Sequence, residues 1–339
     1  RDPTPPELPE PSELPEPEEG SKERKSDYKT ALDYQNTDTR CSMMGLHNEL
    51  VPKMTSVIYH EIANAIFWRS DGQIDLRKTG TYAMASLRFF QDVARCPRKA
   101  ENLSPEEDQW IRSAYIGGLT WAEPYEGIAT ELDFNEYYPH ILACGSTCWP
   151  IGPEEFKTFT HISVNPINFN LKYGIYHVFI EGQPAGQKCT RTFRYNPAGY
   201  YTHHDIQMAI DLGLHIELSS ESPNALIFGP NQLMRGDEIF YQWASYLTEI
   251  KHEGGQAGTV AKHMLVSLWE RLYSDRRRPG PHRRMAPFIS ARGCKTVSEK
   301  IRSLGDRIKR VHTDGFILSG KISDQVIGKQ AGELKIVNA

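Results

Sequence analysis

Two carboxylates stand where strand-like segments end, and together they suit divalent-metal chemistry. Asp133 closes the segment 129–133, and Asp314 lies within a second strand-like segment, 310–318, whose Asp314-Gly315 pair favours a hairpin turn. If the two strands are neighbours in one sheet, both side chains can converge on two Mg²⁺ ions about 3.5 to 4 Å apart, an arrangement that serves phosphoryl transfer. The alternative is that both are ordinary turn residues, which need no chemistry.

The elements that must position these carboxylates follow from periodicity. Residues 27–120 have mostly helical patterns, and Ser104-Pro105 followed by acidic residues predicts a helix start. Strands are expected at 128–134, 173–180, 215–218 and 225–228. Thr202 and Asp205 form a capping-box pattern before a short helix, and 238–273 is an amphipathic helical region interrupted by glycines. The chain is therefore expected to be an α+β protein with its strands late.

Composition excludes several classes of protein. The 339 residues are 39% hydrophobic and 24% charged, which is typical of a globular chain with room for about two domains. No apolar run reaches the roughly 18 residues of a membrane helix, and six scattered cysteines do not make a disulfide scaffold. We therefore expect an intracellular protein without membrane partners, and the sequence does not distinguish mitochondrion from nucleus.

Charge is distributed unevenly along the chain. Residues 1–20 hold seven acidic residues and seven prolines, a composition that predicts a disordered tail. In contrast, Arg271–Arg310 contains thirteen Lys and Arg against three acidic residues, a net charge of +10. A block of this kind fits contact with a phosphate backbone, and a solvated helix face is the alternative. The basic residues expected to contact DNA are Arg276, Arg277, Arg278, Arg283 and Arg284.

Four segments, in the expected order, resemble motifs of family B DNA polymerases, most closely the protein-primed members of phages, linear mitochondrial plasmids and self-synthesising transposons. Tyr115-Ile-Gly117-Gly118 resembles Y-x-G-G, and Asp133-Phe-Asn-Glu-Tyr-Tyr138-Pro resembles D-x-x-S-L-Y-P. Residues 262–270, from Lys262 to Glu270, resemble K-x-x-x-N-S-x-Y-G, and His312-Thr-Asp314-Gly resembles D-T-D-S. The resemblance covers most of the chain, from about residue 34 to 337.

The resemblance implies a role for each matched residue. Asp133 and Asp314 would be catalytic and, with the backbone carbonyl of Phe134, would hold two Mg²⁺ or Mn²⁺ ions. Tyr138 would lie under the sugar of the incoming nucleotide and exclude a 2′-hydroxyl; the alternative is that it is a core tyrosine, as Tyr137 could equally be. The remaining implied nucleotide-binding residues are Lys251, Lys262 and Trp269, and the remaining DNA-binding residues are Tyr115, Gly117, Gly118 and Lys335.

The same resemblance predicts a partial right-hand polymerase. Tyr34 and Asp38 match the third exonuclease motif, but the other exonuclease motifs are absent, and we expect no proofreading and no thumb. The expected organisation is a tail (1–26), an exonuclease remnant with linker (27–120), a palm of antiparallel strands and helices with an insertion (121–235), helical fingers (236–275) and a second palm part (276–339). The insertion lies where protein-primed members hold a priming-protein or processivity element.

Four departures from the motifs leave two hypotheses. Val266 and Glu270 replace Asn and Gly of the fingers motif, and His312 and Gly315 replace Asp and Ser of the third palm motif. Glu270 would place negative charge near the triphosphate and weaken nucleotide binding. The first hypothesis is a DNA-directed DNA polymerase that adds dNTPs to the 3′-hydroxyl of a primer–template or to a terminal priming protein. The second is a decayed mobile-element fragment that binds DNA without catalysis.

Overall fold

The computed structural model describes residues 56–162, 171–183, 192–273, 280–322 and 327–338. The chain divides into two units, residues 1–60 and residues 61–339. Helix α2 runs Ser56–Arg69 across that division, and the features below belong to the second unit.

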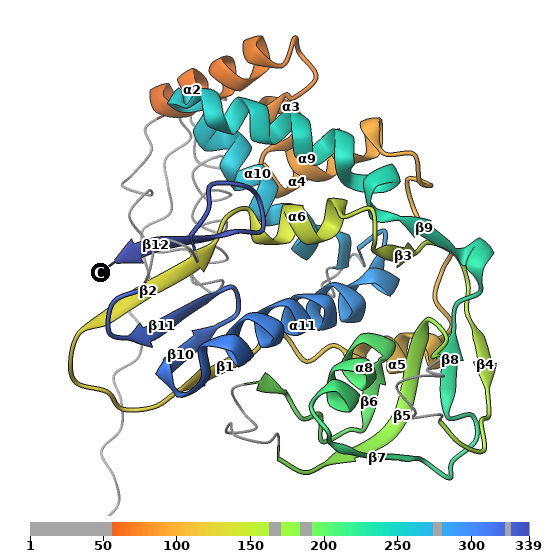
Figure 1. Cartoon of the computed structure of the whole chain (residues 1–339). Coiled ribbons are helices and arrows are strands. Elements are labelled where there is room, and N and C mark those ends of the chain that lie inside the picture. The colour runs from red at the N-terminus through yellow and green to blue at the C-terminus, as the bar shows by residue number, and fades with distance from the viewer. Residues whose placement is uncertain (1–55, 163–170, 184–191, 274–279, 323–326, 339) are drawn as a thin grey trace, which may run out of the picture. The chain divides into compact units, whose positions relative to one another are not determined.

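The first sheet of the second unit has five antiparallel strands in the order β1-β10-β11-β2-β12 (Figure 1). Their bounds are β1 Thr120–Ala122, β2 Ala129–Phe134, β10 Ile308–His312, β11 Gly315–Ser319 and β12 Leu334–Asn338. Buried and partly exposed residues alternate along β2, and Leu132 and Phe134 point to the buried face with Phe316 and Leu318 of β11. This alternation fixes the register that brings the ends of β2 and β11 together.

A second sheet, also of five strands, lies on the other side of helix α11 (Ala286–Leu304) (Figure 1). It consists of β4 (Glu155–Lys157), β8 (Ala225–Ile227), β5 (Gly174–Glu181) and β6 (Tyr200–Thr202), and β7 (His215–Leu218) pairs with β5. Helix α8 (His203–Asp211) follows β6 and packs on α11. A separate pair of short strands, β3 (Cys148–Pro150) and β9 (Leu233–Arg235), precedes the long helices, with the 3₁₀ turn Pro230–Gln232 before β9.

Two long helices, α9 (Gly236–Glu253) and α10 (Gly255–Tyr273), pack against each other and against α4 (Tyr82–Val93). Buried aromatic residues join them: the rings of Phe90 and Phe240 stack at 5.0 Å, and the indole of Trp243 donates to the hydroxyl of Ser86. Gly254 ends α9 with φ of +80°, a conformation that glycine adopts without a steric cost. Helix α6 (Tyr137–Ala143) follows β2 and contacts both α9 and α11.

The remaining described elements are short: α3 (Leu76–Thr79), α5 (Pro105–Ala114), and the 3₁₀ turns Arg283–Met285 and Gly305–Arg307. Ser104 caps α5 and Pro105 opens it, as predicted from the sequence. The mixed α+β class is confirmed, with antiparallel strands on helices. None of the described helices combines the length and the apolar character that crossing a membrane needs.

The predicted hairpin exists, but its turn is displaced by one residue. The turn residues are Thr313 and Asp314, and Gly315 pairs with His312 as the first residue of β11. Thr313 adopts φ of +59°, which a β-branched residue rarely does. The backbone N–H of Thr313 donates to the carbonyl of Leu119 at 2.9 Å. This contact with a neighbouring segment stabilises the turn, a role that the sequence pattern assigned to Gly315.

Candidate active site

The register of the five-stranded sheet brings Asp133 and Asp314 to one edge. Gly315 is the partner of Asp133 across β11 and β2, so Asp314 lies one residue beyond the end of that ladder. The backbone N–H of Phe134 donates to the carbonyl of Asp314 at 3.1 Å, which ties the two strand ends together. The two carboxylates converge because β2 pairs with β11. The sequence alone predicted this convergence only for the case in which the two strands are neighbours.

The electrostatics of the edge reflect two neighbouring carboxylates. Burial raises the pKa of Asp314 to about 6, and the negative charge of Asp133 contributes to the rise. The ammonium of Lys335, on β12, lies 3.1 Å from Oδ2 of Asp133. Lys335 was expected to contact DNA, and here it is the cation that compensates Asp133.

These residues fit a divalent metal through the chemistry of their donors. Asp133 and Asp314 are neighbouring carboxylates with the ammonium of Lys335 beside Asp133, and carboxylates are hard oxygen ligands of the kind that Mg²⁺ takes. In the described parts of the chain, no three His, Cys, Asp or Glu side chains are grouped to hold a metal ion. The rest of a coordination shell would therefore come from a backbone carbonyl such as that of Phe134, from water and from phosphate oxygens.

The segment with Gly117 and Gly118 packs directly on the β10–β11 hairpin that carries Asp314. A Cβ atom on Gly118 would lie 2.8 Å from Oγ1 of Thr313, so only glycine allows this approach. Gly117, at φ of +80°, accepts hydrogen bonds on its carbonyl from the hydroxyl of Ser290 and, at 3.8 Å, from the thiol of Cys294. Both donors lie on α11, which therefore fixes the segment beside Asp314.

A row of aromatic rings leads away from the carboxylates. Tyr138 stacks on Trp269 at 5.6 Å, Trp269 on Tyr273 at 6.2 Å, and Tyr273 contacts Tyr115 at 4.4 Å. Burial raises the pKa of Tyr138 above its ordinary value, and the negative charge of Asp314 adds to the rise, so this phenol lies near the acidic edge. The row joins three predicted site residues from three separate parts of the sequence.

The two candidate tyrosines of α6 separate clearly. The ring of Tyr137 is buried against Phe134, and its hydroxyl donates to the carbonyl of Gly293 at 2.5 Å. Tyr138 is partly exposed and faces Trp269. Tyr137 is therefore a core residue, and Tyr138 is the one that is available to a ligand.

The two lysines expected to meet a triphosphate differ in their surroundings. Lys262, on α10, is exposed and makes no ion pair with any residue that the structure describes. The ammonium of Lys251, near the end of α9, lies 2.6 Å from Oε1 of Glu136. Glu136 stands where the motif D-x-x-S-L-Y-P has serine, and this departure was the signal in the sequence that could have singled it out.

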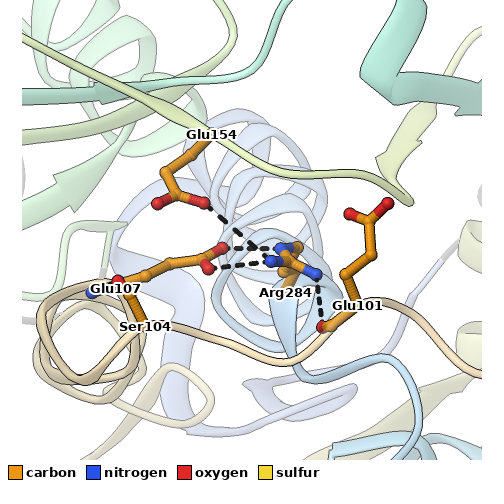
Figure 2. A network of polar contacts seen from close by, with 5 residues as sticks. All are labelled: Glu101, Ser104, Glu107, Glu154 and Arg284. Carbon is orange, nitrogen blue, oxygen red and sulfur yellow. Dashed lines mark hydrogen bonds and ion pairs between the residues drawn. The ribbon is translucent and has the colours of Figure 1, made fainter.

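Arg283 and Arg284 are buried in ion pairs, so neither presents the exposed cation that the predicted DNA contact requires, and the prediction is corrected for both. Arg284 is 1% exposed, and Nε and Nη2 donate to the two carboxylate oxygens of Glu107 at 2.6 and 2.8 Å. Figure 2 shows Glu154 and the carbonyl of Glu101 on the other sides of the same guanidinium. Arg283, 7% exposed, pairs with Asp108 at 2.7 Å. Both arginines therefore anchor the start of α11 to α5.

Five further predicted site residues lie outside the described residues. They are the DNA-contact candidates Arg276, Arg277 and Arg278 and the exonuclease pair Tyr34 and Asp38. Their roles stay predictions from the sequence.

Comparison with known proteins shows the family of the chain. The family described as DNA polymerase type B, organellar and viral, matches residues 15–213, which is more than half of the chain. Comparison with curated protein sequences finds no match.

Solved structures give the same fold. The chain is similar to Phi29 DNA polymerase complexed with primer-template DNA, with a TM-score of 0.62 and 19% identity over 83% of this chain and 57% of that one. It is also similar to the same polymerase complexed with single-stranded DNA, with a TM-score of 0.61 and 20% identity over 86% and 58% of the two chains. The ternary complex with incoming nucleotides gives a TM-score of 0.57 and 20% identity over 85% and 59%. The chain thus spans less than two thirds of the Phi29 polymerase.

Proposed function

Because the chain belongs to the type B DNA polymerases of organelles and viruses, we propose that it extends the 3′-hydroxyl of a DNA primer with dNTPs. The observation that carries the proposal is the meeting of Asp133 and Asp314 at one sheet edge, through the pairing of β2 with β11. The fold shared with a polymerase complexed with primer-template DNA supports the same substrate class. A protein primer is a further proposal that rests on the resemblance to protein-primed members.

Asp133 and Asp314 would hold divalent metal, with the carbonyl of Phe134 as a third donor. Bound there, Mg²⁺ or Mn²⁺ would neutralise charge on the attacking and leaving oxygens of phosphoryl transfer. The partly buried position of Asp314 limits water around the reacting groups, and the ammonium of Lys335 balances the charge of Asp133 until a ligand arrives. These side chains therefore serve to hold and orient cations at the edge.

The aromatic row would bind the nucleotide and the primer end. Tyr138 presents a flat ring that is held by Trp269, and a ring in that position leaves no space for a 2′-hydroxyl on the incoming sugar. Lys262 offers an exposed ammonium on the same helix face as Trp269, because the two are seven residues apart in α10. Gly118 packs closely on Thr313, so this glycine pair lies beside the hairpin, and the resemblance gives Gly117 and Gly118 a role in DNA contact there.

The test is primer extension on a primed single-stranded template with dNTPs and Mg²⁺. We expect Asp133→Asn and Asp314→Asn each to lower the extension rate by more than about a hundredfold, because each removes a charged metal ligand and keeps the side-chain shape. Glu131→Gln, on the same strand as Asp133, is the matched control and should retain activity. Extension that survives in both Asp variants would reject this site.

The second hypothesis, DNA binding without catalysis, has less support from the structure than from the sequence. It relied on the basic block, and two of its arginines are buried in ion pairs. In the same assay it corresponds to DNA binding without extension in the unaltered chain.

A further inference from the structure

Glu136 gathers three polar groups from helix α9. Its Oε1 lies 2.6 Å from the ammonium of Lys251 and 3.1 Å from Nε2 of His252, and its Oε2 accepts from the hydroxyl of Thr248 at 3.5 Å. The side chain of Glu136 is 10% exposed, whereas that of Lys251 is 28% exposed. This carboxylate is therefore committed to α9 on both of its oxygens.

Its place in the chain puts the carboxylate inside the proposed nucleotide site. Glu136 lies three residues after Asp133 and two before Tyr138, at the N-terminal end of α6. Its backbone adopts φ of +50°, a left-handed conformation that is unfavourable for a glutamate and persists only where surrounding contacts hold it. The contacts with α9 supply such a hold, so the position is determined by the tertiary structure.

The ion pair alters what Lys251 can do for an anion. An ammonium that contacts a carboxylate at 2.6 Å attracts a phosphate weakly, because the two charges nearly cancel at the distance of an incoming ligand. Lys262 has no such partner among the described residues. Of the two lysines, only Lys251 must therefore release a carboxylate before it can pair with phosphate oxygens.

We propose that Glu136 sets the affinity for a nucleoside triphosphate by competing with its phosphates for Lys251. This inference rests on the proposed function, and it adds that Glu136 weakens the binding of the nucleotide. A triphosphate carries more negative charge than one carboxylate, so it displaces Glu136 at sufficient concentration. The ligand-free enzyme keeps the end of α9 paired with the start of α6, and nucleotide binding breaks that pair.

Calorimetric titration with inorganic tripolyphosphate tests the competition without requiring catalysis. We expect Glu136→Gln to tighten binding about two- to fivefold, the range that removal of a partly exposed ion pair can give. The gain should vanish in the Lys251→Met background, because the competed group is then absent. Glu253→Gln is the matched control, since this residue lies on the same helix and pairs with Arg69 instead.

Two results would overturn the proposal: equal affinity in wild type and Glu136→Gln, or the same gain with and without Lys251. Glu136→Asn provides a second variant whose side chain suits the left-handed backbone, so that a folding defect in one variant is recognised by the other. In primer extension, both variants should lower the KM for dNTP and leave kcat within about twofold. A gain in tripolyphosphate affinity without any extension would reject the polymerase function and retain the competition.

Discussion

Arg284 shows how a single charged side chain can hold a segment of the molecule. Its guanidinium is surrounded by the two oxygens of Glu107, the carbonyl of Glu101 and, at 3.9 Å, Glu154. Figure 2 shows these groups arranged around one buried cation. The arginine precedes α11 directly, and α11 carries Ser290 and Cys294, the donors to Gly117. The ion pair therefore lies one element away from the candidate site.

Breaking this pair should destabilise the fold. We expect Arg284→Met to lower the free energy of unfolding by about 3–5 kcal/mol, because it leaves Glu107 as a buried carboxylate without its partner. The double variant with Glu107→Leu should recover most of that loss, since both charges are then removed. Urea unfolding measures the difference, with Arg235→Met as the control, because the ion pair of Arg235 with Asp237 is much more exposed. A double variant as unstable as Arg284→Met would contradict the assignment.

At the scale of elements, the β10–β11 hairpin that carries Asp314 depends on its contact with Gly118, which lies shortly before β1. A Cβ atom on Gly118 would lie 2.8 and 2.9 Å from Oγ1 and Cγ2 of Thr313, at the turn that carries Asp314. Thr313 is already held at a positive φ, so it has little freedom to move away without displacing Asp314.

We therefore expect Gly118→Ala to lower kcat of primer extension by about ten- to a hundredfold, the effect of displacing a reacting group by about 1 Å. Gly229→Ala is the matched control, because no atom lies within 4 Å of its added Cβ and its φ is −71°. Kinetics and thermal unfolding of both variants separate misplacement of the turn from general instability. Unchanged kcat in Gly118→Ala would show that the hairpin adapts.

The local sequence pattern predicted helices and strands well, but it did not predict which distant residues contact one another. The strand His215–Leu218 and the capping box of Thr202 with Asp205 were predicted as they occur, because both depend on residues within four positions. The turn at Asp314 was misplaced by one residue, because the carbonyl of Leu119 and the contact with Gly118 hold Thr313 in a conformation that its own side chain disfavours. Tertiary contacts outweighed the local preference for glycine in the turn.

In the candidate site too, the sequence predicted the local features and missed the long-range contacts. The two aspartates follow from strand ends and motif spacing, whereas the ion pairs of Glu136 and Arg284 join residues 115 and 177 positions apart. A run of positive charge has the same composition whether it faces solvent or buried carboxylates. The difference depends on Glu107 and Asp108, which lie in another part of the chain.

At the scale of the whole unit, two histidines of α8 are buried between the second sheet and α11. His203 is packed between the rings of Tyr173 and His204, and the N–H of Gly174 donates to its Nδ1 at 3.4 Å. Burial lowers the pKa of His203 to about 3 and holds the pKa of His204 well below its ordinary value, with the positive charges of Arg292 and Lys295 adding to both. Both side chains are therefore neutral in the folded protein.

These two residues make the fold sensitive to mild acid. The unfolded chain protonates each histidine below pH 6.5 and the folded chain does not, so stability is lost as pH falls from 6.5 towards the folded pKa. Each should account for about 2 kcal/mol of unfolding free energy between pH 7 and pH 5. Asp314, whose pKa in the folded protein is raised to about 6, has the opposite effect on stability, because it favours the folded state as pH falls over the same range. This contribution is the same in all variants compared.

We expect His204→Gln, which cannot titrate, to reduce the loss of stability between pH 7 and pH 5 by about 2 kcal/mol, even if the variant is less stable at pH 7. His215→Gln, at an exposed position on β7, is the control for a histidine-to-glutamine substitution outside the buried pair. Urea unfolding at a series of pH values gives both profiles. Parallel profiles for the wild type and His204→Gln would mean that His204 gains a proton in the folded state, and the packing of α8 on α11 would then have to admit a charge.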